Sequence, residues 1–131
     1  MRYVALFPDN ENSVSSNDLN LKRKSGHVVG PVTVSDEYLF VKRYFRYYYI
    51  SYNDADKIFR RVRSLHANIC CGDGDIEVEY LVICAGGREI LEVTLPGKKA
   101  AKMLMEELKQ IRPELDTSAP VKEKSENEAN E

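Results

Sequence analysis

The stretch from Pro96 to Pro113 constrains the fold more than any other part of this chain. Its apolar residues repeat at spacings of three and four, which places them on one face of a helix: Ala100, Ala101, Leu104, Leu108 and Ile111. Gly97 suits the start of a helix, and Pro113 prevents its continuation. A helix of this length is marginal alone in water, so its apolar stripe must pack against the rest of the chain.

Most of the chain before this helix has the alternation and β-branched content of strands. We expect strands over residues 3–7, 27–34 (interrupted by a bend), 38–43, 47–51, 57–65, 77–84 and 89–95. Ile58, Val62 and Leu65 also have a helical spacing, but the Phe, Ile and Val content favours a strand there. Loops are expected at 9–20 and 66–75, and a hairpin turn at 85–87.

The length of 131 residues indicates one domain, which we place at residues 1–113. No apolar run approaches the roughly 18–20 residues of a membrane span, and the N-terminal apolar run is too short for a signal peptide. We therefore expect a cytoplasmic protein.

The number and spacing of the three cysteines, Cys70, Cys71 and Cys84, do not indicate a disulfide framework. Residues 114–131 are charged and poor in apolar residues, so we expect a disordered acidic tail.

Charge is distributed unevenly, although the net charge is only −2. Residues 20–66 hold ten Lys and Arg and four Asp and Glu, whereas residues 114–131 hold two Lys and six acidic residues. A basic middle is compatible with an anionic partner or with a solvated surface.

Aromatic residues from Tyr44 to Tyr52 alternate with Arg43 and Arg46. They suit a β-core, a protein partner or base stacking, but the chain lacks a nucleic-acid-binding motif and is not basic overall.

The segment His66–Asp75 holds the best candidates for metal binding, which are His66, Cys70 and Cys71. Adjacent cysteines rarely bind one ion with good geometry, and Cys84 or His27 would have to complete the site from elsewhere. Buried thiols in a loop are the simpler explanation, so we predict no metal and no cofactor. Asp73-Gly74-Asp75 indicates a turn, because it lacks the later ligands of a calcium loop.

The order of strands followed by one helix, together with the local sequence, resembles the pleckstrin-homology-like (PH-like) fold of bacterial proteins, particularly small ones of Gram-positive anaerobes. The resemblance rests on GPVTVSDEYLFVKRYFRYYYISYNDADKIFRRV (30–62), on LVICAGGREILEVTL (81–95) and on the helix after Pro96. It implies an α+β, mainly β fold: a PH-like barrel of about seven antiparallel strands capped by one C-terminal helix. Lipids, peptides and proteins are all ligands of this fold, so it implies no single function. The chain differs from lipid-binding PH domains in having no Trp.

No motif for catalysis is present, so we expect a non-enzymatic binding or regulatory module that engages a protein or peptide partner. The expected partner surface consists of Lys22, Arg23, Lys24, Lys42, Arg43, Arg46, Tyr47 and Tyr49. The alternative is a module for anionic membrane surfaces, which requires the six basic residues of this set to share one face. A metal-binding protein that uses the His66–Asp75 segment is a further alternative.

Overall fold

The computed structural model of the chain describes residues 2–6, 15–69 and 72–118. Within these residues it has eight strands and two helices: β1 (Arg2–Ala5), α1 (Ser16–Lys24), β2 (His27–Val29), β3 (Val32–Val34), β4 (Tyr38–Arg43), β5 (Arg46–Ser51), β6 (Lys57–Ile69), β7 (Gly72–Ala85), β8 (Arg88–Thr94) and α2 (Lys98–Ile111). The expected mainly β architecture with a C-terminal helix is confirmed.

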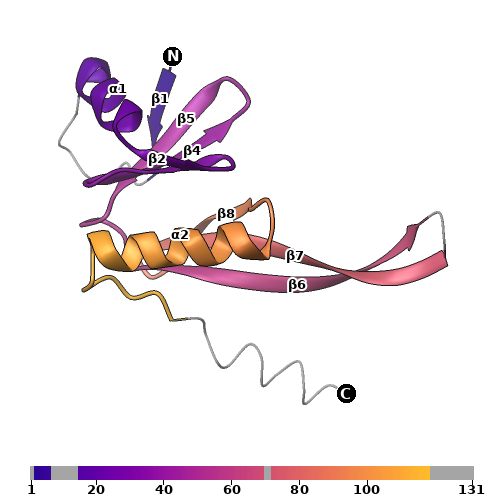
Figure 1. Cartoon of the computed structure of the whole chain (residues 1–131). Helices are drawn as coiled ribbons and strands as arrows, with labels where there is room; N and C mark the ends of the chain where they lie inside the picture. The colour runs from indigo at the N-terminus through magenta and orange to yellow at the C-terminus, as the bar shows by residue number, and fades with distance from the viewer. Residues whose placement is uncertain (1, 7–14, 70–71, 119–131) are drawn as a thin grey trace.

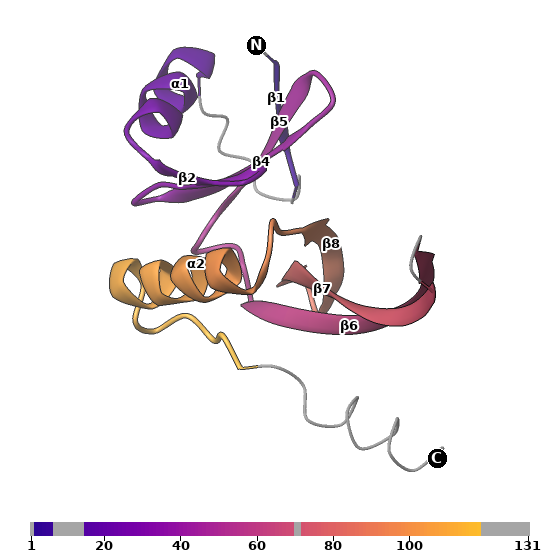
Figure 2. The ribbon, with the colours of Figure 1, turned by 45° about the vertical axis from the view of Figure 1, so that its right-hand side comes forward.

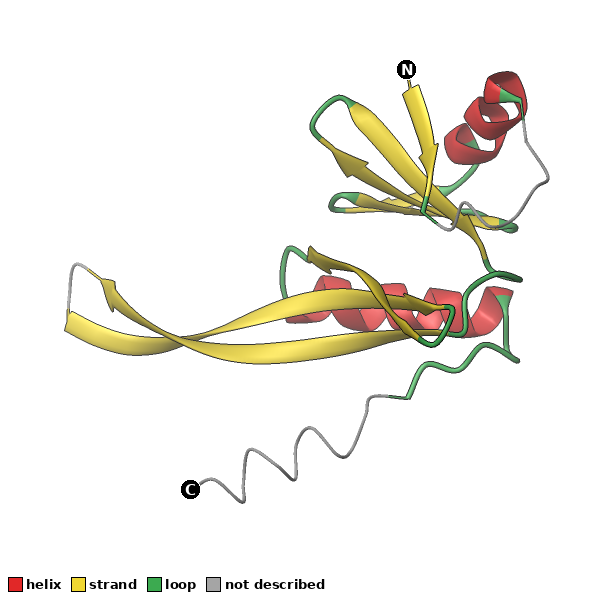
Figure 3. Cartoon of the chain, turned by 180° about the vertical axis from the view of Figure 1, so that it is seen from behind, coloured by secondary structure: helices red, strands yellow, loops and turns green. Residues whose placement is uncertain are grey.

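The strands form two separate sheets (Figures 1 and 3). Sheet A has the order β1-β5-β4-β3-β2, in which β1 runs parallel to β5 and the other neighbours are antiparallel. Sheet B is the antiparallel meander β6-β7-β8. The described strands do not close into a barrel, so the expected barrel of about seven antiparallel strands is wrong in its closure and in the direction of β1; the described residues form eight strands.

Helix α1 lies over one face of sheet A, and α2 lies on the other side of that sheet, beside sheet B (Figure 2). Because side chains alternate along a strand, sheet A supplies two apolar faces. Leu39, Val41 and Ile50 face the main core with residues of sheet B and α2. Phe40, between Leu39 and Val41, faces α1 and is fully buried.

Helix α2 occupies the predicted position, and its apolar stripe enters the core as expected. Ala101, Leu104 and Leu108 are fully buried, while Ala100 and Ile111 pack at the margin of the core. The β2–β3 turn lies against the beginning of this helix. Gly30 in that turn has φ +60°, and a Cβ atom there would lie 2.7 Å from Pro96 Cγ. Only glycine meets both requirements without a shift of the backbone.

The loop predicted at residues 9–20 is wrong from residue 16, where α1 begins; residues 9–14 lie outside the described residues. Ser15 caps the helix, and its Oγ accepts a hydrogen bond from the Asp18 N–H at 3.2 Å. Leu19 is the one described residue of α1 that is buried, and it packs under the helix on sheet A. A single apolar contact leaves little periodicity, which explains why a loop was expected.

The loop predicted at residues 66–75 is wrong at residues 66–69 and 72–75, because β6 continues to Ile69 and β7 begins at Gly72; residues 70–71 lie outside the described residues. The register runs without a shift from Lys57↔Cys84 to Ile69↔Gly72. Polar and glycine residues in this stretch therefore extend a ladder that begins in the core. The strand expected at 57–65 is confirmed as part of β6.

A buried ion pair joins β6 and β7 where they leave the core. Arg60 Nε and Nη2 donate to the two oxygens of Glu79 at 2.5 and 3.0 Å. The Glu79 side chain is only 3% exposed. Hydrogen bonds from Arg60 hold the pKa of Glu79 below its usual value, against the opposing effect of desolvation.

We expect Leu104→Ala to lower the free energy of unfolding by about 2–5 kcal/mol, because it leaves a cavity between the two sheets. The matched control is Met103→Ala, since the neighbouring Met103 is 46% exposed and its truncation leaves no cavity. Urea denaturation of the three proteins measures the difference. Equal losses for the two variants would contradict the assignment of Leu104 to the core.

We expect the stability advantage of the wild type over Glu79→Gln to depend on pH. Because the pKa of folded Glu79 is lowered, its pairing with Arg60 contributes fully above about pH 5, where an unfolded glutamate is ionised. The contribution disappears as the pH falls through the lowered pKa. Urea denaturation at pH 6 and pH 3 measures this, with exposed Glu77→Gln as the control; a pH-independent difference would refute it.

Candidate functional site

The face of sheet A below α1 is lined by aromatic rings, which are Tyr3, Tyr38, Phe40, Tyr47 and Tyr49. Tyr3 stacks on Tyr47 with ring centroids 5.7 Å apart, and Tyr38 meets Tyr49 edge to face at 5.8 Å. Such pairs stabilise a sheet beyond the area that they bury. Two residues of the aromatic run, Tyr47 and Tyr49, therefore lie on the face of sheet A that packs against α1.

Arg23 of α1 lies over this aromatic cluster. Its Nε donates to the Tyr3 hydroxyl at 2.9 Å and its Nη1 to the Tyr47 hydroxyl at 3.3 Å, while its Cζ lies 4.3 Å from the Tyr47 ring centroid. Three interactions of one guanidinium hold the helix on the sheet. Arg23, Tyr47 and Tyr49 of the predicted partner surface are thus engaged within the chain.

The other basic residues of the predicted surface do not gather on one face. Lys22 pairs with Glu37 at 2.6 Å and with Asp36 at 3.5 Å, at the turn between β3 and β4. Lys24 is exposed at the end of α1. Lys42 lies on the aromatic face, with its Nζ 6.0 Å from the Tyr47 ring centroid.

Arg43 and Arg46 lie opposite one another in the register of β4 and β5, on the other face of sheet A from Lys42. Arg43 Nη2 donates to the Glu92 carbonyl of β8 at 3.2 Å. The six basic residues therefore lie on two faces of the sheet, and the single surface that the membrane hypothesis requires is not formed.

The turn between β4 and β5 presents two aromatic side chains to solvent. Tyr44 is 89% exposed and Phe45 is 90% exposed, the highest values among the described large hydrophobic residues. Lys42, Arg43 and Arg46 flank them in the sequence and surround the turn. In Figure 1 this turn extends from the end of sheet A, away from α2. We name Tyr44, Phe45 and the three flanking cations the β4–β5 tip.

The backbone of the β4–β5 tip does not favour the residues that occupy it. Arg43 pairs with Arg46, so Tyr44 and Phe45 form a two-residue hairpin loop. Tyr44 has φ +56°, and it is the one described residue other than glycine with a positive φ. A positive φ at the first of two loop residues is the type II′ pattern, in which glycine is preferred. A bulky residue in this left-handed conformation costs roughly 1–2 kcal/mol.

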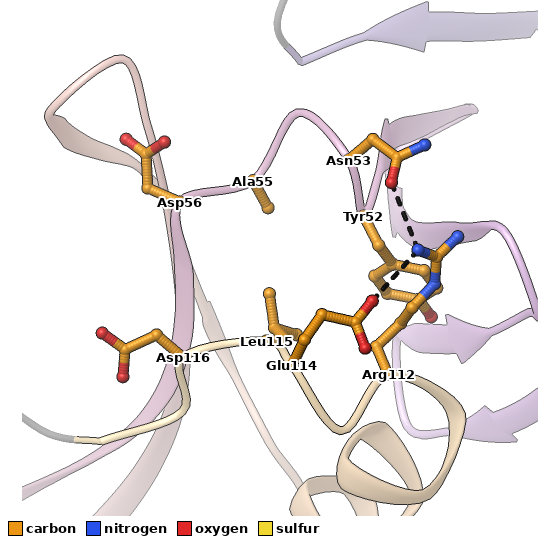
Figure 4. A pocket seen from close by; sticks show the side chains of 8 residues that line it. All are labelled: Tyr52, Asn53, Ala55, Asp56, Arg112, Glu114, Leu115 and Asp116. Carbon is orange, nitrogen blue, oxygen red and sulfur yellow. Dashed lines mark hydrogen bonds and ion pairs between the residues drawn. The ribbon is translucent and has the colours of Figure 1, made fainter.

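A hollow lies where the chain leaves α2 and runs beside the β5–β6 connection (Figure 4). Its lining residues are Tyr52, Asn53, Ala55, Asp56, Arg112, Glu114, Leu115 and Asp116. Arg112 Nη1 donates to Asn53 at 3.2 Å and to Glu114 at 3.3 Å, and its Cζ lies 5.7 Å from the Tyr52 ring centroid. Arg112 thus ties the segment after α2 to the β5–β6 connection.

The polar groups of this hollow are also used internally. The Tyr52 hydroxyl donates to the Ser35 carbonyl at 2.9 Å, and burial raises the Tyr52 pKa far above its usual value. Asp56 accepts a hydrogen bond from the Gly87 N–H of the β7–β8 turn at 2.9 Å. Both groups support the fold, and neither has the arrangement of an activated nucleophile or base.

Of the predicted metal candidates, the structure describes only His66. His66 Nδ1 lies 3.3 Å from Asp75 across the β6–β7 ladder, and Cys70 and Cys71 lie outside the described residues. His27 pairs with Glu107 of α2, and the partly buried thiol of Cys84 has a raised pKa, chiefly because of desolvation. Within residues 2–6, 15–69 and 72–118, no three His, Cys, Asp or Glu residues form a group that could hold a metal ion.

Comparison with protein-family models, with curated proteins and with solved structures finds no significant match for this chain. In the described part of the chain, no helix has the length and apolar character of a membrane span. The function is therefore inferred from the geometry of this structure. Its most unusual surface feature is the β4–β5 tip, whose two exposed aromatic residues the sequence analysis did not select. Their position between two strongly predicted strands was the available signal.

We expect Arg23→Ala to speed hydrogen exchange of the α1 amides, because the substitution removes two hydrogen bonds and the contact with the Tyr47 ring. The loss of stability should be about 1–3 kcal/mol. Lys24→Ala, at the exposed neighbouring position, is the control and should change stability by less than about 0.5 kcal/mol. Equal protection of α1 in both variants would show that Arg23 does not hold the helix.

Proposed function

We propose that this chain is a non-enzymatic binding module that engages a protein partner through the β4–β5 tip. The observation that carries the proposal is the near-complete exposure of two neighbouring aromatic side chains, Tyr44 at 89% and Phe45 at 90%. They make no contribution to the core, and the turn would accept glycine and a polar residue more readily. These two side chains stabilise the protein only when another surface covers them and removes their apolar area from water.

The chemistry of the tip defines the partner surface that it fits. A Phe side chain and a Tyr side chain together suit an apolar depression, in which the Tyr hydroxyl can still reach a polar rim. Lys42 and Arg46 flank the rings, so carboxylates at that rim complement them. Tyr and Arg are the residues most enriched among those that dominate protein–protein binding energy. We therefore propose an apolar pocket with an acidic rim on the partner protein.

A protein surface fits these observations better than an anionic membrane. Each basic residue near an anionic membrane contributes about 1 kcal/mol, so several must act together. Only three cations flank the tip, and Arg43 among them is bonded to the Glu92 carbonyl. Lys22 and Arg23, which the membrane hypothesis also used, are engaged within the chain.

The element order supports a PH-like fold as part of this proposal. Strands β2 to β5 are antiparallel neighbours in sheet A, β6 to β8 form sheet B, and α2 follows and covers the core. The resemblance implies about seven strands followed by a helix, and β2 to β8 followed by α2 have this succession. Strand β1 and helix α1 are additions to it in this chain. The fold itself is shared by modules with different ligands, so the function is argued from the tip alone.

The test is site-specific photo-crosslinking in the source cells. A photoreactive phenylalanine analogue replaces Phe45 in one variant and Val28 in the control, because Val28 is also strongly exposed, at 63%, but lies on β2. We expect a protein adduct of one size from position 45 that position 28 does not form. The purified adduct partner should then bind the unmodified chain saturably. Adducts with lipid alone, or the same adducts from both positions, would overturn the proposal.

We expect the double substitution Tyr44→Gly and Phe45→Ser to separate binding from stability. Glycine relieves the left-handed conformation at residue 44, so the free energy of unfolding should stay within about 1 kcal/mol of the wild type or rise. Affinity for the crosslinked partner should fall by at least about tenfold, because truncation of central aromatic residues commonly costs 1–2 kcal/mol or more. Isothermal titration and urea denaturation measure the two effects. An unchanged affinity would show that the tip is not the contact.

A further inference from the structure

Strands β6 and β7 extend past the rest of the molecule as a two-stranded arm (Figures 1 and 3). Strand β8 pairs with β7 only from Tyr80 to Ala85, so the ladder from Arg63↔Val78 to Ile69↔Gly72 has no third strand among the described residues. Apolar side chains on the arm remain exposed: Val62 at 44%, Leu65 at 44% and Ile76 at 45%. A two-stranded ribbon without a supporting layer is marginal in water. The arm therefore lacks a partner surface within the described chain.

The outer edge of β6 has backbone groups that pair with no other strand of the described residues. The Ile58 N–H donates to the Asp116 carbonyl at 3.0 Å, which shows that the backbone groups of Ile58 point away from β7. Residues at intervals of two point the same way, so Arg60, Val62, Ser64 and His66 present their N–H and C=O groups at this edge. No other described segment hydrogen-bonds to the edge between Phe59 and Ile69.

The segment that follows α2 does not extend along this edge. Asp116 makes a parallel bridge with Lys57, but the Ser118 N–H donates to the Asp116 carboxylate at 3.1 Å instead of to β6. Ser118 therefore does not continue the bridge as a parallel ladder along β6.

Nothing in the sequence of this edge blocks pairing. Natural edge strands are usually protected by proline, lysine or a bulge. Residues 59–69 contain no Pro and no Lys, and the β6–β7 register has no shift. The three arginines of β6 face carboxylates of their own sheet: Arg60 pairs with Glu79, Arg61 with Glu89 and Glu92, and Arg63 with Glu92. Their charge is thus compensated within one molecule. The edge therefore does not repel a second copy of the chain, and it has no excess positive charge that would favour an acidic peptide.

We propose that two copies of this chain pair through their arms, with β6 antiparallel to β6 around a two-fold axis at Ser64. Ser64 is the midpoint of the open edge from Phe59 to Ile69, so this register pairs the whole edge. A closed two-fold interface of this kind joins the two copies of sheet B into one continuous sheet.

Charge also selects this register. With the axis at Ser64, Arg63 lies opposite Leu65 of the second copy, and Val62 lies opposite its His66. An axis at Val62 would place Arg61 opposite Arg63, and an axis at Arg63 would place that residue opposite itself. Like charges directly opposite one another destabilise a strand pair. The Ser64 register avoids every arginine–arginine pair.

The first test compares two proline variants of the full chain by sedimentation velocity between about 1 and 100 µM, a range in which moderate dimers dissociate. Ser64→Pro removes an N–H that points to the outer edge of β6. The matched control is Glu77→Pro, because Glu77 pairs with Ser64 in the ladder and its N–H points to the opposite edge, as the Leu95 N–H to Glu79 carbonyl bond indicates. We expect dimers of the wild type and of Glu77→Pro, and about tenfold or more weaker dimers of Ser64→Pro.

The second test does not depend on how the arm tolerates proline. Ser64 is exposed, so Ser64→Arg and Ser64→Glu should fold, and each should weaken its own dimer by placing like charges at the axis. An equimolar mixture of the two variants should restore the dimer. A monomeric wild type over the whole concentration range, or a mixture that behaves as its two components do alone, would overturn the proposal.

Discussion

The apolar stripe of α2 is the contact on which the rest of the structure depends. Ala101, Leu104 and Leu108 are fully buried and join residues of both sheets in one core. Neither sheet could bury its inner face without this helix, because α1 covers only the opposite face of sheet A. The helix fixes how the two sheets meet, and it leaves the β4–β5 tip and the β6–β7 arm outside the core.

Most charged residues of the basic middle serve the fold. Arg23 holds α1 on the aromatic face, and Arg60 and Arg61 pair with carboxylates of sheet B. A guanidinium can bond several acceptors in one plane, which suits it to joining elements that share little apolar contact. As a result, a cluster of basic residues in the sequence does not become a basic surface. Two surface features remain. One is the pair of exposed aromatic residues at the β4–β5 tip, and the other is the outer backbone edge of β6 in the β6–β7 arm.

The candidate site was predictable only in part. Lys42, Arg43 and Arg46 were selected from the sequence and do lie at the β4–β5 tip, whereas Tyr47 and Tyr49 of the same run are partly buried in ring contacts on the face below α1. Alternation assigns side chains to two faces of a strand, but it does not show which face another element covers. Tyr44 and Phe45 are exposed because the turn falls on them, and a shift of the turn by one residue would exchange the faces.

By itself, the sequence determined the mainly β content, the positions of β4 and β5, the start of β6 and the presence and buried stripe of α2, because these depend on local periodicity. Tertiary structure alone decided the separation into two sheets, the parallel partner of β1 and the length of the arm. Those features depend on contacts between distant residues, such as the ladder that carries Gly72 and Asp75 into a strand against their own preference. Tertiary structure also decided which group each arginine pairs with. The partner of a guanidinium lies on another element, so the local sequence around the arginine does not indicate it.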